Sequence, residues 1–255
     1  YDALLAGRVP EARGAVAGPS AWVNRLSRYA GRLSSDDMRR RREIGPIPSL
    51  PLDMNEGANT ADREACFVSS VTGPALDAMT EIAKAEGIEA HLLCALGSVL
   101  TRWTGEERFV VDLERMGRPP LFRDLDITRS LGWFTALAPV TLGSATGAAP
   151  RRALAATIRD LPEGGLGHVL ATYLHADAAL PPVQRPQVSV NYFGRATTSQ
   201  TTGPFQPSER ATGPHRAALG VRPYLIEISA VWKPEAFEIS WHYPSALLRE
   251  STLSQ

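Results

Sequence analysis

The stretch Phe109-Val110-Val111-Asp112-Leu113-Glu114-Arg115-Met116-Gly117-Arg118 sets an apolar run directly before a carboxylate and two arginines that flank a glycine. The apolar residues at its start predict a buried strand. Glu114 therefore stands at a strand end beside fixed cations, where a carboxylate can transfer protons, and it is our first candidate for catalysis. The alternative interpretation is structural: an ion pair of Glu114 with Arg115 or Arg118 that holds a turn.

Regular hydrophobic patterns continue on both sides of this strand. Gly73-Pro74 begins a predicted helix, with the proline near its first position, and Gly87 ends it. The next helix, residues 89–103, is apolar nearly all round, which predicts burial. Periodicity predicts further strands over residues 67–71, 134–142, 188–192, 224–232 and 237–243, and helices over residues 150–161 and 166–174. This order predicts a mixed α/β layer with helices packed against a sheet.

The first 65 residues have a different pattern. Helical spacing from Trp22 onward predicts a helix with Ser20 as its N-cap, and a second short helix is predicted over residues 36–43. Three prolines within residues 46–51 cannot continue a helix. A late segment, residues 196–218, is rich in Thr, Ser, Gly and Pro and predicts a long loop. We therefore divide the chain into a helical segment (residues 1–45), a linker (46–65) and a lobe (66–255).

Composition gives little evidence for a nucleic-acid or membrane partner. Lys and Arg number 27 and Asp and Glu number 27, so the formal net charge is +0 and the charge balance supports neither partner. No apolar stretch reaches the length of a bilayer span and no signal peptide is recognised, which predicts a cytoplasmic protein. The run Arg39-Arg40-Arg41-Arg42 is interpreted as a solvated face, with docking of an acidic carrier protein as the alternative.

Cysteine and histidine usage predicts no metal site. Cys66 and Cys94 lie far apart in apolar contexts, which predicts buried core thiols in a reducing cytoplasm and supports neither a zinc site nor a disulfide. His168 is interpreted as a solvated or core histidine rather than a ligand. The histidines are scattered singly, at His91, His168, His175, His215 and His242.

Four segments resemble, in order, the core motifs of the epimerisation domains of nonribosomal peptide synthetases, which belong to the condensation-domain superfamily. Each motif is short, and it is the four together, over residues 66–255, that carry the resemblance. They are Glu114-Arg115-Met116-Gly117-Arg118-Pro119, similar to E-G-H-G-R-E; Arg129-Ser130-Leu131-Gly132-Trp133-Phe134-Thr135, similar to R-T-V-G-W-F-T; Pro162-Glu163-Gly164-Gly165-Leu166-Gly167-His168, similar to P-x-x-G-x-G-Y; and Val190-Asn191-Tyr192-Phe193-Gly194, similar to F-N-Y-L-G.

The chain also departs from the family pattern. Met116 stands where the family has His, Pro119 where it has Glu, His168 where it has Tyr, and Val169 where it has Gly. The superfamily motif H-H-x-x-x-D-G of the N-terminal lobe is absent from the sequence. Residues 1–7 resemble the end of the helix that follows that motif, so the resemblance implies a C-terminal lobe whose N-terminal lobe, carrying HHxxxDG, lies outside this chain.

The resemblance implies one lobe of the two-lobed, chloramphenicol-acetyltransferase-like fold, with an active site between the lobes. It also implies an epimerase that removes the α-hydrogen of an aminoacyl or peptidyl thioester and returns a proton to the opposite face. The family's proton-handling glutamate maps to Glu114, and its partner is the histidine of the missing lobe. Asn191 and Tyr192 match the family's N-Y pair and could hydrogen-bond an oxyanion. Alternatively, Tyr192 is a strand aromatic.

A substrate channel is expected around the remaining motif residues. Trp133 and Phe134 are interpreted as core or channel wall rather than as catalytic. The glycine-rich segment is interpreted as a turn or as a close backbone approach to a pantetheine arm. The substrate is expected on the phosphopantetheine of a peptidyl carrier protein, with no cofactor bound directly by this chain. The residues expected along the channel are Arg118, Trp133, Phe134, Thr135, Gly165 and Gly167.

Three other functions remain open from the sequence. A peptide-bond-forming condensation domain shares the fold but normally lacks the Glu-Gly-His-Gly-Arg run. A non-catalytic recruitment domain of the same fold would account for the altered residues Met116, Pro119 and His168. An unrelated acyltransferase has only the fold in its favour, and fold does not establish function.

Overall fold

The computed structural model describes residues 2–9, 17–144, 147–174, 184–196, 210, 213 and 216–255. His175, His215 and most of the loop predicted over residues 196–218 lie outside the described residues.

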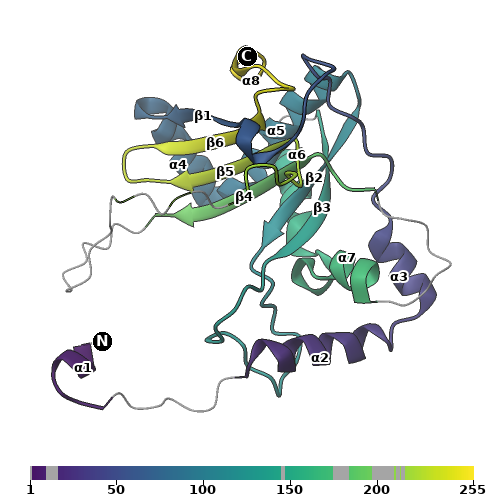
Figure 1. Ribbon diagram of the computed structural model, residues 1–255, viewed down its shortest axis with the longest axis vertical. Helices are drawn as coiled ribbons and strands as arrows, with labels where there is room; N and C mark the ends of the chain where they lie inside the picture. The colour runs from purple at the N-terminus through teal and green to yellow at the C-terminus, as the bar shows by residue number, and fades with distance from the viewer. Residues whose placement is uncertain are drawn as a thin grey trace.

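A six-stranded mixed sheet organises the chain (Figure 1). Its strand order is β1-β6-β5-β4-β2-β3. The pairs β2–β4 and β4–β5 are parallel and the other three are antiparallel. The strands are β1 (Glu64–Val71), β2 (Arg108–Arg115), β3 (Ala136–Gly143), β4 (Val188–Arg195), β5 (Ile226–Trp232) and β6 (Phe237–Pro244). The predicted mixed α/β fold is therefore confirmed.

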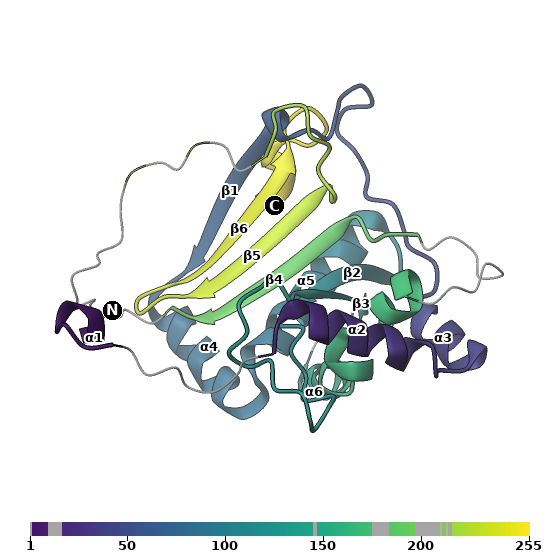
Figure 2. The same cartoon turned by 60° about the horizontal axis from the view of Figure 1, so that its bottom comes forward.

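Three long helices cover one face of the sheet, and none of them lies over the opposite face, which we call the open face although parts of it are buried by other segments (Figure 2). The covering helices are α4 (Gly73–Glu86), α5 (Ile88–Thr104) and α6 (Ala148–Arg159). Alternate strand residues such as Val111, Val190 and Ile228 belong to the core beneath α5 and α6, as expected where successive side chains point to opposite faces. The prediction that α5 is buried all round is wrong at Val99, which is 42% exposed. One stripe of that helix therefore faces solvent.

A second core forms beyond the edge strand β3. Two N-terminal helices, α2 (Pro19–Ala30) and α3 (Ser35–Arg42), pack there against the turn η2 (Pro162–Gly165), helix α7 (Gly167–Val169) and the π-helical turn η3 (Leu170–Leu174) (Figure 1). Its buried members include Trp22, Leu26, Met38, Leu166 and Leu170. Residues 19–42 of the predicted helical segment are therefore packed onto the lobe.

The caps of these two helices differ from the prediction in one case. Gly18, not Ser20, is the N-cap residue of α2, and Pro19 occupies its first turn. The proline fixes a helical backbone one residue earlier than the predicted cap. Ser34 caps α3 through a capping box with Asp37.

The predicted linker is extended but firmly attached. Ile47 and Leu50 are buried, and the Leu50 amide donates to Oε1 of Gln187 at 2.6 Å. The short turn η1 (Ala61–Arg63) leads into β1, which already includes the last two linker positions. The predicted linker therefore contacts the core of the lobe through Leu50.

The prediction that both cysteines are core thiols is wrong. Cys66 is exposed and Cys94 is partly buried. β1 is an edge strand whose alternate residues face the open side of the sheet, and Cys66 stands at one of these outward positions. Apolar neighbours in sequence do not bury a residue that the pleat turns outward.

Candidate functional site

Glu114 lies near the end of β2 and points to the open face of the sheet. Its neighbours Leu113 and Arg115 have the opposite orientation, because Leu113 belongs to the helix-covered core and Arg115 ion-pairs with Glu89 of α5. The carboxylate is half-buried. This places an acidic group on the face that the helices of the chain leave uncovered.

Asn191 of β4 fixes the Glu114 carboxyl. Its Nδ2 donates to Oε2 of Glu114 at 2.6 Å, across the parallel β2–β4 pair. Burial raises the pKa of Glu114, the negative charge of Glu227 raises it further, and the hydrogen bond from Asn191 opposes both. The result is a carboxyl that holds a proton at higher pH than an exposed glutamate does.

The two arginines of the motif are engaged elsewhere, so the alternative of an ion pair with Glu114 is wrong. Arg115 Nη1 contacts both carboxylate oxygens of Glu89, at 2.8 and 2.9 Å. Arg118 donates to the backbone oxygens of Ile127 and Gly132 and lies 3.9 Å from the Phe134 ring centroid. Arg118, which we expected along a substrate channel, therefore holds the 127–134 loop in place.

Tyr192 does not join Glu114 and Asn191. Because it follows Asn191 in the same strand, its side chain points to the helix-covered face. There it packs in a cluster with Trp232 and Phe237, with 6.2 Å between its ring centroid and that of Phe237. This placement matches the strand-aromatic alternative and separates the predicted Asn-Tyr pair by the thickness of the sheet.

Two further residues of the open face lie beside Glu114 and were not among our candidates. Tyr224 donates its hydroxyl to Oδ2 of Asp112 at 2.8 Å, and both residues are buried. Burial raises the pKa of Asp112, although Tyr224 and the charge of Arg185 counteract it. Burial and the Asp112 and Glu114 charges raise the pKa of Tyr224. The two-residue spacing from Asp112 to Glu114 was the available signal for a shared face; no sequence signal pointed to Tyr224.

A cavity of about 270 Å³ with a mixed polar and apolar lining adjoins this group. It opens between β2 and the η3 region, and Asp112 and Tyr224 form part of its wall, together with Leu137, His168, Thr172, Tyr173, Gln184 and Arg185. His168 is partly buried there, with its Nδ1 3.2 Å from the Arg41 carbonyl oxygen, and burial lowers its pKa. Its interpretation as a core histidine is consistent with this position.

The Trp-Phe-Thr motif lies in the loop between β2 and β3. Trp133 is 91% exposed, so its interpretation as a core residue is wrong. Phe134 is half-buried under Arg118, and Thr135 is exposed. The loop returns so closely that a Cβ on Gly117 would lie 1.6 Å from the Phe134 carbonyl oxygen, which requires glycine there.

The glycine-rich segment is a tight turn beside β3. Gly165 has a φ of +100°, and a Cβ there would lie 2.7 Å from the Arg115 side chain. A Cβ on Gly167 would lie 2.6 Å from Pro162. Both glycines are buried and border a small cavity of about 140 Å³. The atoms that come close to these glycines belong to the chain itself, which agrees with the interpretation of the segment as a turn.

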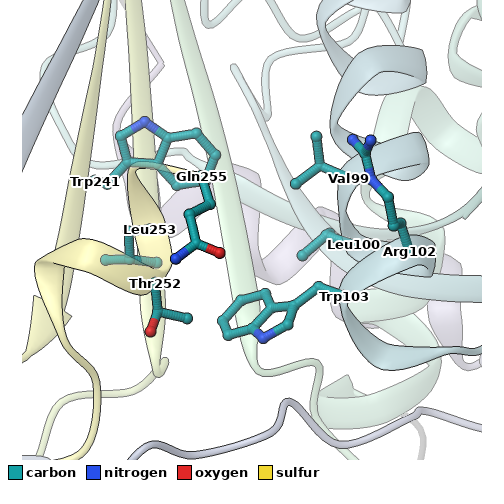
Figure 3. Close-up of a pocket in the computed structure, with 8 residues that line it drawn as sticks. All are labelled: Val99, Leu100, Arg102, Trp103, Trp241, Thr252, Leu253 and Gln255. Atoms are coloured by element: carbon teal, nitrogen blue, oxygen red, sulfur yellow. The ribbon is translucent and has the colours of Figure 1, made fainter.

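Another cavity, of about 390 Å³, lies on the helix-covered side of the sheet. It is flanked by the indoles of Trp103 and Trp241 and is bordered by Thr252 and Leu253 of the C-terminal helix α8 (Glu250–Leu253) and by Gln255 (Figure 3). Glu114 faces the other side, so this cavity takes no part in the candidate site. Among the described residues, no cluster of His, Cys, Asp and Glu could hold a metal ion, and no helix is long and apolar enough to cross a membrane.

Comparison with known proteins assigns the class. The family model for the condensation domain matches residues 39–255, so the chain belongs to the condensation-domain family. A solved epimerization domain, from the third module of tyrocidine synthetase B, superposes with a TM-score of 0.82 at 23% identity, over 99% of this chain and 59% of that one. The fold is thus confirmed as that of one part of a condensation or epimerisation domain.

The relatives with similar sequences are large synthases, and the chain matches a small part of each. The chain is 29% identical over 273 aligned positions to a linear gramicidin synthase of Brevibacillus parabrevis, covering 100% of this chain and 5% of that protein. It is 30% identical to chondramide synthase cmdD of Chondromyces crocatus, over 82% of this chain and 6% of that protein. The resemblance to the condensation-domain superfamily is therefore confirmed, and the chain spans a small fraction of the length of the relatives it matches.

Proposed function

We propose that this chain is the C-terminal part of an epimerisation domain that inverts the α-carbon of an aminoacyl or peptidyl thioester. The observation that carries the proposal is the Glu114 carboxyl on the open face of the sheet, held by Asn191 at 2.6 Å and free of the arginines that flank it in sequence. A glutamate used only to hold a turn would be expected to pair with one of those cations.

The chemistry follows from the state of that carboxyl. Epimerisation needs a group that donates a proton to the α-carbon on one face after a base on the other face has removed the original hydrogen. Because burial and the charge of Glu227 raise its pKa, Glu114 keeps its proton to higher pH than an exposed glutamate does, which suits a proton donor. Asn191 engages Oε2, so Oε1 is the oxygen that would exchange the proton.

The second proton-handling group and the substrate would come from outside these 255 residues. The sequence contains no H-H-x-x-x-D-G run, so we assign the opposing base to a histidine in the preceding lobe. The thioester would be presented on the phosphopantetheine arm of a peptidyl carrier protein. Of the expected channel residues, Arg118 supports the loop, and the exposed Trp133 and Thr135 are available to contact the arm or the other lobe.

Exchange at the α-carbon tests the proposal. The complete two-lobed domain is incubated in D₂O with an aminoacyl thioester on its carrier protein, and deuterium in the product is measured. Glu114→Gln should reduce exchange by at least about 100-fold, whereas Glu238→Gln, on the same face at β6, should leave it unchanged. Normal exchange in the Glu114 variant would refute the role of this carboxyl.

The runner-up is peptide-bond formation, which the condensation-domain family model favours. A condensation domain joins donor and acceptor thioesters and has no need for a proton donor at Glu114. If the complete domain forms a dipeptidyl thioester and Glu114→Gln retains that activity without any α-exchange, the condensation function is the correct one.

A further inference from the structure

A thiol, an imidazole and a carboxylate are aligned at the far edge of the open face. Cys66 of β1 and His242 of β6 are directly paired across the antiparallel strands, and Cys66 Sγ lies 3.8 Å from His242 Nε2. His242 Nδ1 lies 3.1 Å from Oε1 of Glu64. This is the order of a nucleophile, its base and the group that orients the base.

The carboxylate defines the state of the imidazole. An ionised carboxylate only accepts hydrogen bonds, so His242 Nδ1 must carry the proton that is donated to Glu64. In the neutral ring, Nε2 is then the acceptor that faces Cys66. Burial and the charge of Glu64 raise the pKa of Cys66. The group is therefore a thiol that needs a base to become a nucleophile, and the base is adjacent to it.

The charged surroundings keep Glu64 ionised. Although burial opposes it, the charge of Arg222 and the hydrogen bonds from His242 and Arg222 hold the pKa of Glu64 below its usual range. Arg222 lies 2.9 Å and Arg216 3.5 Å from Glu64 Oε2. Both arginines also contact Glu227, which is the other charged group facing His242 from the neighbouring strand β5.

The site is separate from Glu114. β1 and β2 are separated in the sheet by β6, β5 and β4, and four interstrand steps correspond to about 19 Å. Both groups nevertheless face the same side. The exposed Sγ of Cys66 is thus available to a molecule that approaches the open face without touching the Glu114–Asn191 pair.

We infer that Cys66 is an acyl-acceptor thiol that takes an acyl group from a thioester, with His242 as general base and Glu64 as its orienting partner. The Cys66 Sγ–carbon bond forms as the carbon–sulfur bond of the donor thioester breaks. The thiol proton passes to His242 Nε2 and then to the departing thiolate, so that one thioester replaces another and no oxidant or cofactor is consumed. The thioester class of donor rests on the proposed function.

A small donor tests this without a carrier protein. The protein is incubated with an acetyl thioester of N-acetylcysteamine at pH 7, and the acyl adduct is located by peptide mass spectrometry. We expect one adduct on Cys66, at least about 10-fold faster than on Cys94, and its loss in Cys66→Ser but not in Cys94→Ser. His242→Gln should slow acylation at least about 10-fold, within the range for loss of a general base.

The pH dependence gives an independent readout. The wild-type acylation rate should increase with pH, as attack by a thiol that must lose its proton requires, and the increase should differ in His242→Gln because the base is absent. If that variant fails to fold, the wild-type profile and the Cys66-to-Cys94 ratio decide alone. Absence of an adduct, equal labelling of both cysteines or a flat pH profile would overturn the inference. If Cys66 is still acylated in Glu114→Gln, the thiol site acts independently of Glu114. The inference about Cys66 can then be judged apart from the result of the α-exchange experiment.

Discussion

Nδ2 of Asn191 lies 2.6 Å from Oε2 of Glu114 and joins two parallel strands through their outward side chains. The hydrogen bond opposes the effects of burial and of Glu227 on the carboxyl. It therefore adjusts the proton affinity of Glu114 and also fixes its position.

Replacing Asn191 by aspartate should raise the pKa of Glu114. A second carboxylate beside Glu114 raises the pKa of the pair and removes the donor. Because the donor that positions Glu114 is lost, we expect α-exchange to fall by at least about 10-fold, and because Glu114 then titrates at higher pH, we expect the pH optimum to move to higher pH. Asn191→Ala, which only removes the donor, is the matched control and should reduce exchange with a smaller shift of the optimum. A profile in Asn191→Asp that coincides with wild type would show that the two side chains are not coupled.

Glu114→Gln should not destabilise the fold at neutral pH. Because the folded-state pKa of Glu114 is raised, the folded chain binds this proton more tightly than the unfolded chain, and stability declines as pH rises from the ordinary glutamate range through the folded-state pKa. A glutamine side chain does not ionise, so the variant does not lose this stability at high pH, and its amide oxygen can still accept the hydrogen bond from Asn191. The Tm of the variant should equal or exceed that of wild type at pH 8, and the two should converge at pH 4. A clearly lower Tm at pH 8 would mean that the carboxylate stabilises the fold.

The contacts of Glu163 with Arg41 of α3 and Tyr29 of α2 should stabilise the packing of these two helices on the lobe. Glu163 Oε1 lies 2.6 Å from Arg41 and accepts from the Tyr29 hydroxyl at 2.8 Å, and its side chain is 6% exposed. Glu163→Gln removes the carboxylate nearest to Arg41 and leaves only the more distant Asp37, at 3.9 Å, which should cost about 3 kcal/mol in chemical denaturation. The exposed pair Lys84–Glu81 is the comparison, since Glu81→Gln should change stability by less than about 1 kcal/mol.

The same contacts of Glu163 predict that the folded protein loses stability at acidic pH. Although burial opposes it, Arg41 and Tyr29 lower the pKa of Glu163, so its stabilisation is present above the ordinary glutamate pKa and is lost as pH falls toward the folded-state value. Wild type should lose more stability than Glu163→Gln between pH 6 and pH 3. Parallel loss in the two proteins would contradict this assignment.

Two tryptophans should respond oppositely to truncation. Trp133 is 91% exposed and Trp22 is 3% exposed. Trp133→Ala should leave the unfolding free energy within about 0.5 kcal/mol of wild type, whereas Trp22→Ala should cost about 3–5 kcal/mol. If Trp133→Ala abolishes α-exchange in the complete domain while stability is unchanged, Trp133 belongs to an interface with the substrate arm or the preceding lobe.

The helices and strands could be predicted from the sequence, but which strands lie side by side in the sheet could not. Apolar runs located β2 and β4, but their parallel contact joins residues far apart in the chain, and no local pattern encodes it. Strand position also decided the error at Cys66, because an apolar sequence context does not reveal that β1 lies at a sheet edge. Exposure of Trp133 was likewise unpredictable from residue type.

The candidate site was predictable in part. Glu114 and Asn191 came from the motifs and meet in space. Strand alternation alone could have separated Tyr192 from Asn191 and grouped Asp112 with Glu114. Tyr224 required the three-dimensional structure, since its hydroxyl meets Asp112 from a distant segment.

The position of β1 has a consequence for synthesis of the protein. β1 is made before the other strands of this sheet, yet its sheet neighbour is β6, which is made after all of them, with Val71 opposite Phe237. Until translation reaches that strand, the edge residues of β1 have no partner in the sheet, and such long-range pairing slows folding. A nascent chain arrested before β6 would therefore expose an unpaired strand to chaperones and to neighbouring nascent chains.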